Sequence, residues 1–262
     1  MAKEKKPLLL LTNDDGFQAS GLNNLIDAIR PLGEIVVVAP NISQSGMSGA
    51  ITAFNPIRAT LIKKEEDLTI YSCTGTPVDC VKLGLNKILD RKPDLLLSGI
   101  NHGSNAAVCI FYSGTIGAVF EGCINGIPSL GVSLTDHSPR ADFSQAVKYG
   151  KFVAEKVLLN GLPEGICLNL NVPDISNVTG LKICSQTKSY WTKEFMEMKD
   201  PHGRTIYWLT GELCDEEPEN TYSDQWALNH GYAALVPLHI NMTAYSFMEK
   251  IKDWETQHTS LP

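Results

Sequence analysis

Residues 8–17 read LLLLTNDDGF, an apolar segment that leads directly into two adjacent carboxylates. Residues 7–12 predict a buried first strand, and the almost uninterrupted apolar run at 34–39 is typical of a strand that is covered on both faces of a sheet. Asp14 and Asp15 come just after the first strand. Two neighbouring carboxylates repel each other and each resists leaving water, so the pair needs either open solvent or a cation. The doublet is therefore the first candidate site in the chain.

The order of strand and then helix continues through the first two-thirds of the chain. No hairpin dipeptide separates the expected strands, and this order predicts an α/β fold with a parallel sheet and helices on both of its faces. The expected strands are 7–12, 34–39, 94–98, 129–133 and 166–172, and the expected helices are 22–30, 77–88, 113–125 and 143–159. The less regular segments are a Gly- and Ser-rich loop at 41–50 and an irregular or β-like stretch at 51–70.

The pattern changes after Pro173. The elements expected there are a long hairpin with arms at 181–187 and 205–211, an acidic loop at 212–219, a strand at 231–237 and a last helix at 243–254. We expect a core over residues 1–175 and a smaller β-hairpin and helix extension over residues 176–262. The extension would serve in oligomer assembly, and a single integrated domain is the alternative.

Composition and charge limit the partners of the chain. It has 262 residues, of which 43% are hydrophobic, and a net charge of −7. The hydrophobic content is sufficient for a sizeable core. A negative chain does not suit the phosphates of a nucleic-acid polymer, although a local site for a small anion stays open.

The N-terminus reads MAKEKKPLLLL, which imitates an export signal by being basic and then apolar. Its apolar run is about five residues, shorter than the roughly 7–15 that such a signal needs. No stretch approaches the ~20 apolar residues of a membrane span. The seven cysteines are single, with no CxxC pair, which favours reduced thiols and argues against a zinc site. We therefore expect a cytoplasmic protein with no membrane partner.

Polar loops follow several of the expected strands. In an open α/β sheet, ligands bind beyond the carboxyl ends of the strands, so these loops should converge on one site. The loop sequences are TNDDG at 12–16, APNISQSG at 39–46, CTGTP at 73–77 and SGINHGSN at 98–105. Their convergence, more than any one of them, predicts a ligand site.

Asp14 and Asp15 provide hard oxygen donors, which suit a cation such as Mg²⁺, Mn²⁺ or Ca²⁺. The competing interpretation is that either aspartate caps the next helix or forms an Asx-turn before Gly16. Ser45 is ordinary loop composition by itself. The neutral oxygens of Ser45 and Asn101 are also able to complete a metal shell that two aspartates begin.

Other residues of these loops are candidates for binding an anion. Glycines beside Asn101 and Asn105 allow backbone N–H groups to approach an anion, although tight turns alone would explain them. Residues 112–118, YSGTIGA, can start a helix whose N-terminal N–H groups would receive a phosphate. His102 is the one histidine in a candidate loop. Residues 188–191, KSYW, suit either a base-stacking edge or an ordinary hairpin.

Taken together, these motifs resemble the SurE family of stationary-phase survival proteins, which are metal-dependent 5′/3′-nucleotidases and acid phosphatases. The matching segments, in the order of the family, are TNDDG, VAP with QSG, TGTPVDCVKLGL, SGINHGSN, YSGTIGAVFEG and LNLNVP. The resemblance covers nearly the whole chain. It implies a Rossmann-like, three-layer catalytic core and a C-terminal part that assembles a homodimer or homotetramer.

The resemblance also implies roles for individual residues. One Mg²⁺ or Mn²⁺ ion per subunit would be held by Asp14, Asp15, Ser45 and Asn101. This chain departs from the family at Gly49, where some relatives carry His, and at KSYW, where relatives often carry arginines. The catalytic candidates are Asp14, Asp15 and Asn101. The phosphate-binding candidates are Asn13, Gly46, Gly103, Asn105, Ser113, Gly114 and Thr115.

The resulting hypothesis is metal-dependent hydrolysis of nucleoside 5′- and 3′-monophosphates. Water is favoured over an aspartyl nucleophile, since an aspartate that binds metal with its neighbour is poorly free to attack, and Asp14 is a candidate to take the proton of the water. The alternatives are a non-catalytic nucleotide or metal sensor and a haloacid-dehalogenase-like phosphatase, which would carry Asp-x-Asp after its first strand. A dinucleotide oxidoreductase is disfavoured because no GxGxxG follows the first strand.

Overall fold

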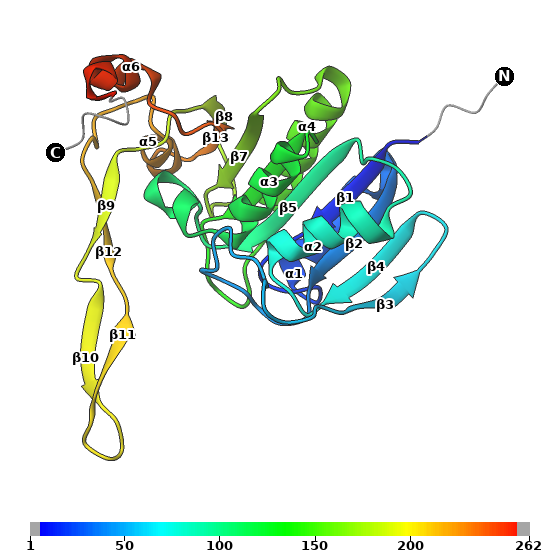
Figure 1. The fold of residues 1–262 in the computed structure, drawn as a ribbon, viewed down its shortest axis with the longest axis horizontal. Coiled ribbons are helices and arrows are strands. Elements are labelled where there is room, and N and C mark those ends of the chain that lie inside the picture. The colour runs from blue at the N-terminus through cyan, green and yellow to red at the C-terminus, as the bar shows by residue number, and fades with distance from the viewer. Residues whose placement is uncertain (1–5, 256–262) are drawn as a thin grey trace.

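The computed structural model describes residues 6–255 and has an α/β architecture (Figure 1). Its main sheet has nine strands in the order β3-β4-β2-β1-β5-β6-β7-β13-β8. These strands are β1 (Leu8–Thr12), β2 (Glu34–Pro40), β3 (Ala59–Lys64), β4 (Leu68–Cys73), β5 (Leu95–His102), β6 (Ser129–Leu134), β7 (Ile166–Val172), β8 (Gly180–Ile183) and β13 (Tyr232–His239). The run from β4 to β7 is parallel, whereas β3 is antiparallel to β4 and β13 is antiparallel to β7.

Helices cover both faces of this sheet, as the alternation of strands and helices predicts. The core on one face is built with α1 and α4, and the core on the other face with α2, α3 and α5. The α-helices are α1 (Ser20–Ile29), α2 (Pro77–Leu83), α3 (Gly114–Ile124), α4 (Ser144–Asn160), α5 (Asp224–Asn229) and α6 (Tyr245–Met248). Shorter helical segments are η1 (Arg30–Leu32), η2 (Gly84–Ile88), η3 (Ala107–Phe111) and η4 (Glu249–Trp254).

The first strand shows why an uninterrupted apolar run is needed in the middle of the sheet. Leu9 and Leu11 pack into the core on the α1 side, and Leu8 and Leu10 pack into the core on the opposite side. Successive side chains of a strand point to opposite faces, so both sets must be apolar when both faces are covered. The predicted strand is confirmed.

The helix that follows the CTGTP loop begins as its sequence predicts. Thr76 and Asp79 form a capping box at the start of α2, in which the Asp79 N–H donates to Thr76 Oγ1 at 3.2 Å and the Thr76 N–H donates to Asp79 Oδ2 at 2.9 Å. These bonds satisfy two N–H groups that the helix itself leaves unpaired.

The strand predicted at 94–98 is longer than expected. β5 continues to His102, and Asn101 and His102 pair with Ser133 and Leu134 of β6 after an irregularity in register. Gly99, at a φ of +136°, lies within that irregularity. The glycine and the polar residues around it suggest a loop by composition, but pairing with β6 keeps them in the sheet.

The predicted pairing of 181–187 with 205–211 is wrong. Residues 180–183 form β8, which lies parallel to β13 at the edge of the main sheet, where Leu181 packs against the core. The partner of β11 (Thr205–Leu209) is β10 (Phe195–Lys199). The physical reason is the turn between them, where Asp200 accepts hydrogen bonds from the N–H groups of His202 and Arg204 and so closes a short local hairpin.

A second pair of strands continues this hairpin toward the body of the protein. β9 (Ser189–Thr192) pairs with β12 (Glu212–Asp215), so the predicted acidic loop is partly strand. The long hairpin of β9 to β12 projects from the main body (Figure 1). The predicted last helix is a single α-helical turn, α6, followed by the 3₁₀ segment η4.

Two further expectations concern the whole chain. All seven cysteines are free, and five of them are buried. Within residues 6–255, no helix combines the length and the apolar character that crossing a membrane requires.

Candidate functional site

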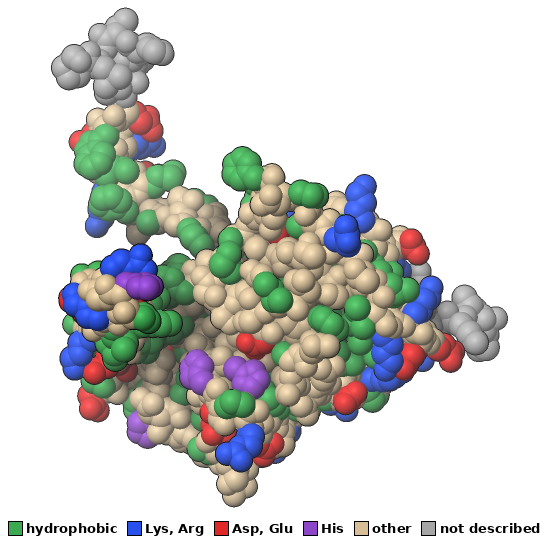
Figure 2. All heavy atoms as spheres, turned by 90° about the horizontal axis from the view of Figure 1, so that it is seen from below, with side chains coloured by type: hydrophobic (Ala, Val, Ile, Leu, Met, Phe, Trp, Pro, Cys, Tyr) green, Lys and Arg blue, Asp and Glu red, His purple; other side chains and the backbone are tan. Residues whose placement is uncertain are grey.

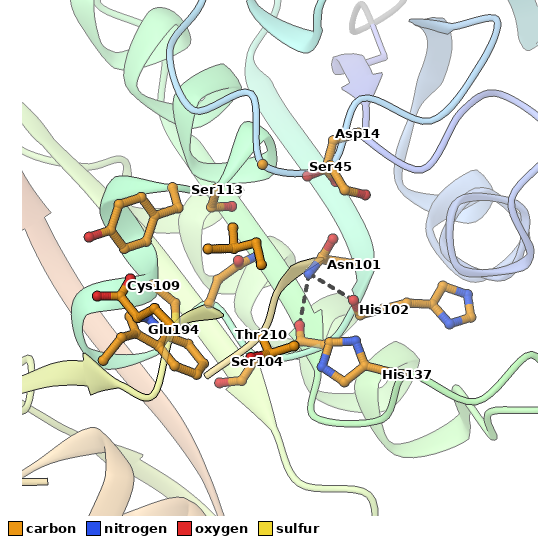
Figure 3. Close-up of a pocket in the computed structure, with 16 residues that line it drawn as sticks. Asp14, Ser45, Asn101, His102, Ser104, Cys109, Ser113, His137, Glu194 and Thr210 are labelled. Carbon is orange, nitrogen blue, oxygen red and sulfur yellow. Dashed lines mark hydrogen bonds between the residues drawn. The ribbon is translucent and has the colours of Figure 1, made fainter. Parts of the chain in front are cut away.

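A cavity of about 410 Å³ opens where the loops after β1, β2 and β5 meet the start of α3 and the hairpin (Figure 3). Its lining residues are Asp14, Ser45, Gly46, Asn101, His102, Gly103, Ser104, Asn105, Cys109, Tyr112, Ser113, His137, Trp191, Glu194, Leu209 and Thr210. The carboxyl ends of parallel strands share one edge of a sheet, which is why loops far apart in sequence meet here.

Asp14 is a buried carboxylate at the end of β1. Its residue is 3% exposed, and Thr115 Oγ1 donates to its Oδ1 at 2.7 Å. Burial is the main cause that raises the pKa of Asp14 to about 6; the Thr115 hydrogen bond opposes this rise, and the negative charge of Asp15 adds to it. An ionised Asp14 therefore lacks compensation from the protein alone.

Asp15 is less buried and lies beside the cavity lining. Its Oδ2 accepts the backbone N–H of His102 at 3.2 Å. Burial raises the pKa of Asp15, and the hydrogen bond from His102 opposes that rise. The backbone of β5 thus holds the second carboxylate of the doublet.

Asn13 forms the turn that the competing interpretation assigned to an aspartate. Asn13 Nδ2 donates to the Gly16 carbonyl at 2.9 Å, and the Gly16 N–H donates to Asn13 Oδ1 at 3.2 Å. The residue before α1 is Ala19, and no side chain caps that helix. Neither aspartate is needed for the turn or the cap, so the local structure leaves the doublet unexplained.

Asn101 and Ser45 bring neutral oxygens to the same cavity. Asn101 Nδ2 donates to the carbonyls of His102, at 3.2 Å, and Gly103, at 2.8 Å. The carboxamide oxygen therefore turns the other way, toward the labelled Asp14 and Ser45 (Figure 3). The Gln44 N–H donates to the Asp14 carbonyl at 2.7 Å, which ties the loop of Ser45 to the doublet.

The start of α3, where the sequence predicts a phosphate site, forms part of the cavity wall. Ser113 lines the cavity and caps the helix, since its hydroxyl accepts the Ile116 N–H at 3.1 Å. A Cβ at Gly114 would lie 3.0 Å from Asp14 Cβ, so glycine allows the helix to approach the carboxylate. The N–H groups of a first helical turn have no partners within the helix, and they face an anion well.

Buried asparagines hold the loop after β5. Asn171 Oδ1 accepts the Asn105 N–H at 2.7 Å, Asn169 Nδ2 donates to the Asn105 carbonyl at 2.8 Å, and Asn171 Nδ2 donates to Asn169 Oδ1 at 3.1 Å. Asn105 Nδ2 also donates to Ser133 Oγ at 2.9 Å. Strands β6 and β7 thus fix the position of Asn105.

The structure brings most of the predicted site residues into one cavity. The predicted residues that line it are Asp14, Ser45, Gly46, Asn101, Gly103, Asn105 and Ser113. Those that do not line it are Asn13, Asp15, Gly114 and Thr115. The hydroxyl of Thr115 is engaged with Asp14, and the side chain of Asn13 is engaged with Gly16.

Several lining residues lie outside the predicted set. His137, from the loop after β6, packs where a Cβ on Gly103 would be 2.0 Å from its ring. The hairpin adds Glu194, Leu209 and Thr210. Among the hairpin residues that line the cavity, the sequence pointed only to Trp191, in KSYW. The others reach the cavity through strand pairing that the sequence does not predict.

The oxygen donors of the site fit a hard divalent cation. Among residues 6–255 no three His, Cys, Asp or Glu side chains gather as a metal site. Two carboxylates with a hydroxyl and a carboxamide form another kind of donor set, made only of oxygen, which Mg²⁺ and Mn²⁺ favour. Asp14 is buried beside a second carboxylate, and a bound cation would compensate the negative charge of the pair.

The comparison with protein families gives a match over residues 9–193 to the model described as Survival protein SurE. This chain belongs to the SurE family. Proteins named 5′-nucleotidase SurE from Phocaeicola vulgatus and Bacteroides fragilis are each 50% identical to it, over 97% of this chain and 99% of theirs. The SurE protein of Aquifex aeolicus has a similar crystal structure, with a TM-score of 0.82 and 37% identity over 95% of this chain and 100% of that chain.

Proposed function

We propose that this SurE-family protein is a metal-dependent phosphomonoesterase that hydrolyses nucleoside 5′-monophosphates, and also 3′-monophosphates, to nucleoside and phosphate. Relatives that match nearly the whole chain are named 5′-nucleotidases. The observation that carries the proposal is the buried Asp14, whose raised pKa reflects a carboxylate that lacks compensation at the end of the cavity. A divalent cation would supply that compensation, and it would also neutralise the negative charge of a bound phosphate ester.

The residues that would hold one Mg²⁺ or Mn²⁺ ion per subunit are Asp14, Asp15, Ser45 and Asn101. When bound, such an ion binds phosphoryl oxygens and lowers the pKa of a coordinated water. The Thr115 hydroxyl occupies Asp14 Oδ1, so Oδ2 is the oxygen of this carboxylate that is left to hold the ion or, in its place, to take the proton of the attacking water.

The chain itself orients the phosphate. In the proposed mechanism the N–H groups at the start of α3 and the side chains of Ser113 and Asn105 contact the phosphoryl oxygens. Because β6 and β7 hold Asn105, its position is set before the substrate arrives. Donors that are already oriented stabilise the charge that develops in the transition state without reorganising.

The experiment that tests the proposed function is a phosphate-release panel. Nucleoside 5′- and 3′-monophosphates and phenyl phosphate would be supplied to the full chain with Mg²⁺, with Mn²⁺, and with EDTA. We expect turnover with a divalent cation, loss of turnover in EDTA, and recovery when the metal is added back. Nucleotide binding without phosphate release would instead identify a sensor.

We further propose a cytoplasmic homodimer or homotetramer. Free cysteines support the location. Hydrophobic side chains gather on the projecting hairpin (Figure 2), and they support assembly, since monomers seldom expose large apolar patches. The exposed hairpin residues are Phe195, Met196, Met198, Tyr207, Trp208 and Leu209. Sedimentation of the full chain tests this, because a monomer at all concentrations would contradict it.

A further inference from the structure

The cavity has a second end that the phosphate chemistry does not use. In Figure 3 the labelled Glu194 lies away from Asp14 and Ser45, on the other side of the cavity. Trp191, Glu194 and Thr210 of the hairpin line the cavity together with Tyr112, which precedes α3. We call these four residues the hairpin wall.

The hairpin wall is held in place by hydrogen bonds and by one close approach. The Thr210 N–H donates to the Glu194 carbonyl at 2.8 Å, and Thr210 Oγ1 donates to the Lys193 carbonyl at 3.1 Å. Gly211 has a φ of +142°, and a Cβ there would lie 2.8 Å from the Trp191 ring. A glycine at this position therefore lets the Trp191 indole lie close to the opposite strand.

The base of the hairpin is also tied to the loop that carries Asn105. The Val108 N–H donates to Ser189 Oγ at 3.2 Å, and Gln186 Nε2 donates to the Ala107 carbonyl at 3.0 Å. Asp224, fully buried at the start of α5, accepts the Ala107 N–H at 2.9 Å. These bonds join the base of the hairpin to the segment that follows Asn105.

Charge decides what the hairpin wall can receive. None of the 16 lining residues is a lysine or arginine, so this end does not suit a second phosphate. Glu194 takes part in none of the ion pairs formed by the described residues. An ionised carboxylate only accepts hydrogen bonds, so its partner here must be a group that donates them.

We propose that the hairpin wall recognises a guanine base, with Trp191 and Tyr112 stacking on its face and Glu194 accepting hydrogen bonds from N1–H and the N2 amino group. The proposal rests on the proposed nucleotidase function and names its preferred substrate, guanosine monophosphate. Aromatic side chains stack on any base, so selectivity depends on the carboxylate. Guanine presents two adjacent donors to it.

The other bases provide a graded comparison. Hypoxanthine keeps N1–H but lacks the N2 amino group, so inosine monophosphate should rank second. Adenine has an acceptor at N1, which would face the carboxylate of Glu194 and repel it. Because Glu194 is exposed to solvent in the free protein, water replaces a missing donor in part, and the discrimination between bases should be moderate.

The test measures kcat/KM with Mn²⁺ for GMP, IMP, AMP and phenyl phosphate in the full chain. We expect GMP to exceed AMP by about tenfold to 100-fold, since a hydrogen bond to a charged group accounts for a difference of that order. Glu194→Gln should bring the GMP to AMP ratio close to one. Glu197→Gln is the matched control, because Glu197 lies on the same hairpin outside the cavity lining, and it should keep the wild-type ratio.

A second variant tests the stacking. Trp191→Ala should lower kcat/KM for every nucleotide roughly tenfold more than for phenyl phosphate, because stacking on an aromatic side chain contributes that order of affinity. Equal rates on GMP and AMP in the wild type, or a ratio that survives Glu194→Gln, would overturn the proposal while leaving the nucleotidase function intact. Hydrolysis of phenyl phosphate with no nucleotide turnover would overturn both.

Discussion

The carboxyl edge of the main sheet and the projecting hairpin line one cavity, yet they are built in opposite ways. At the edge, Asn169 and Asn171 are fully buried and Asp14 is 3% exposed. On the hairpin, Phe195 is 66% exposed and Trp208 is 60% exposed. The edge is supported by several elements of the main body, whereas β10 and β11 are supported mainly by each other.

This difference separates two tasks in the proposed enzyme. A catalytic group must keep its geometry, and buried hydrogen bonds from neighbouring strands maintain that geometry. A surface that selects a substrate tolerates amino-acid substitutions, because the sequence of a loop or hairpin can change without disturbing the packing of the core. We therefore expect substitutions at the edge to remove activity or stability, and substitutions on the hairpin to change selectivity or assembly.

The largest expected effect is at the doublet. Asp14→Asn and Asp15→Asn should each lower metal-dependent hydrolysis of phenyl phosphate by at least about 10³-fold, since each removes a charge that would hold the cation. Circular dichroism should show that the fold persists. The comparison variant is Glu197→Gln on the hairpin, expected to hydrolyse phenyl phosphate like the wild type. Full activity in either aspartate variant would remove the metal assignment.

The next effect is on stability without metal. Burial raises the pKa of Asp14 from 3.8 to about 6, so the native state binds the proton more tightly than the unfolded state. The metal-free protein should therefore lose stability as the pH rises through this window. Asp14→Asn removes the titration, and near neutral pH it should be more stable than the wild type by up to about 3 kcal/mol.

Urea unfolding in EDTA measures this difference. The difference in unfolding free energy between Asp14→Asn and the wild type should be small near pH 4, should grow as the pH rises to about 6, and should stay constant above about pH 7. Adding Mn²⁺ should stabilise the wild type more than the variant. An ion that binds the native state stabilises it, and the variant lacks one of the carboxylates that would hold the ion. A gap that does not change with pH would contradict the assignment of a strained carboxylate.

The edge and the hairpin also differ in how far the sequence predicts them. Asp14, Ser45 and Asn101 follow three expected strands, and the rule that parallel strands end at one edge is sufficient to bring them together. Glu194 and Thr210 reach the cavity only through the pairing of β9 with β12 and of β10 with β11. The turn at Asp200 closes the pair of β10 and β11, while residues 180–183 pair with β13 in the main sheet, and the pattern of apolar residues alone does not predict this division.

The length of β5 gives a second example of this limit. Asn101 and His102 suggest a loop by composition, and the tertiary pairing with β6 keeps them in a strand. His137 carries no motif, and it reaches the cavity because Gly103 leaves space for its ring. The residues at the ends of parallel strands can thus be predicted from the sequence, whereas residues that packing brings to the cavity, such as His137, cannot.

A smaller effect is expected in the asparagine network. Asn171→Ala leaves the Asn105 N–H without its partner, and a buried unpaired donor costs about 1–3 kcal/mol. The loop of Asn105 should also move and lower kcat about tenfold, which is less than the roughly 10²–10³-fold cost of losing an oriented donor outright, because the Asn105 side chain is still present. Asn160→Ala is the matched control, since Asn160 is exposed at the end of α4 and bonds only within its own helix. A stability loss with unchanged kcat would make the network purely structural.

The smallest expected effect compares two glycines beside the loop of Ser45. A Cβ at Gly117 of α3 would lie 2.3 Å from the Ser48 carbonyl, whereas a Cβ at Gly49 would meet no atom within 4 Å. Gly117→Ala should push the loop of Ser45 away from the doublet and lower kcat/KM severalfold, while Gly49→Ala should leave it unchanged. Alanine is the better helix former by roughly 0.5–1 kcal/mol, which offsets part of the clash in Gly117→Ala. A loss of activity without a matching loss of stability would therefore show that α3 positions this loop, and equal behaviour of the two variants would show that it does not.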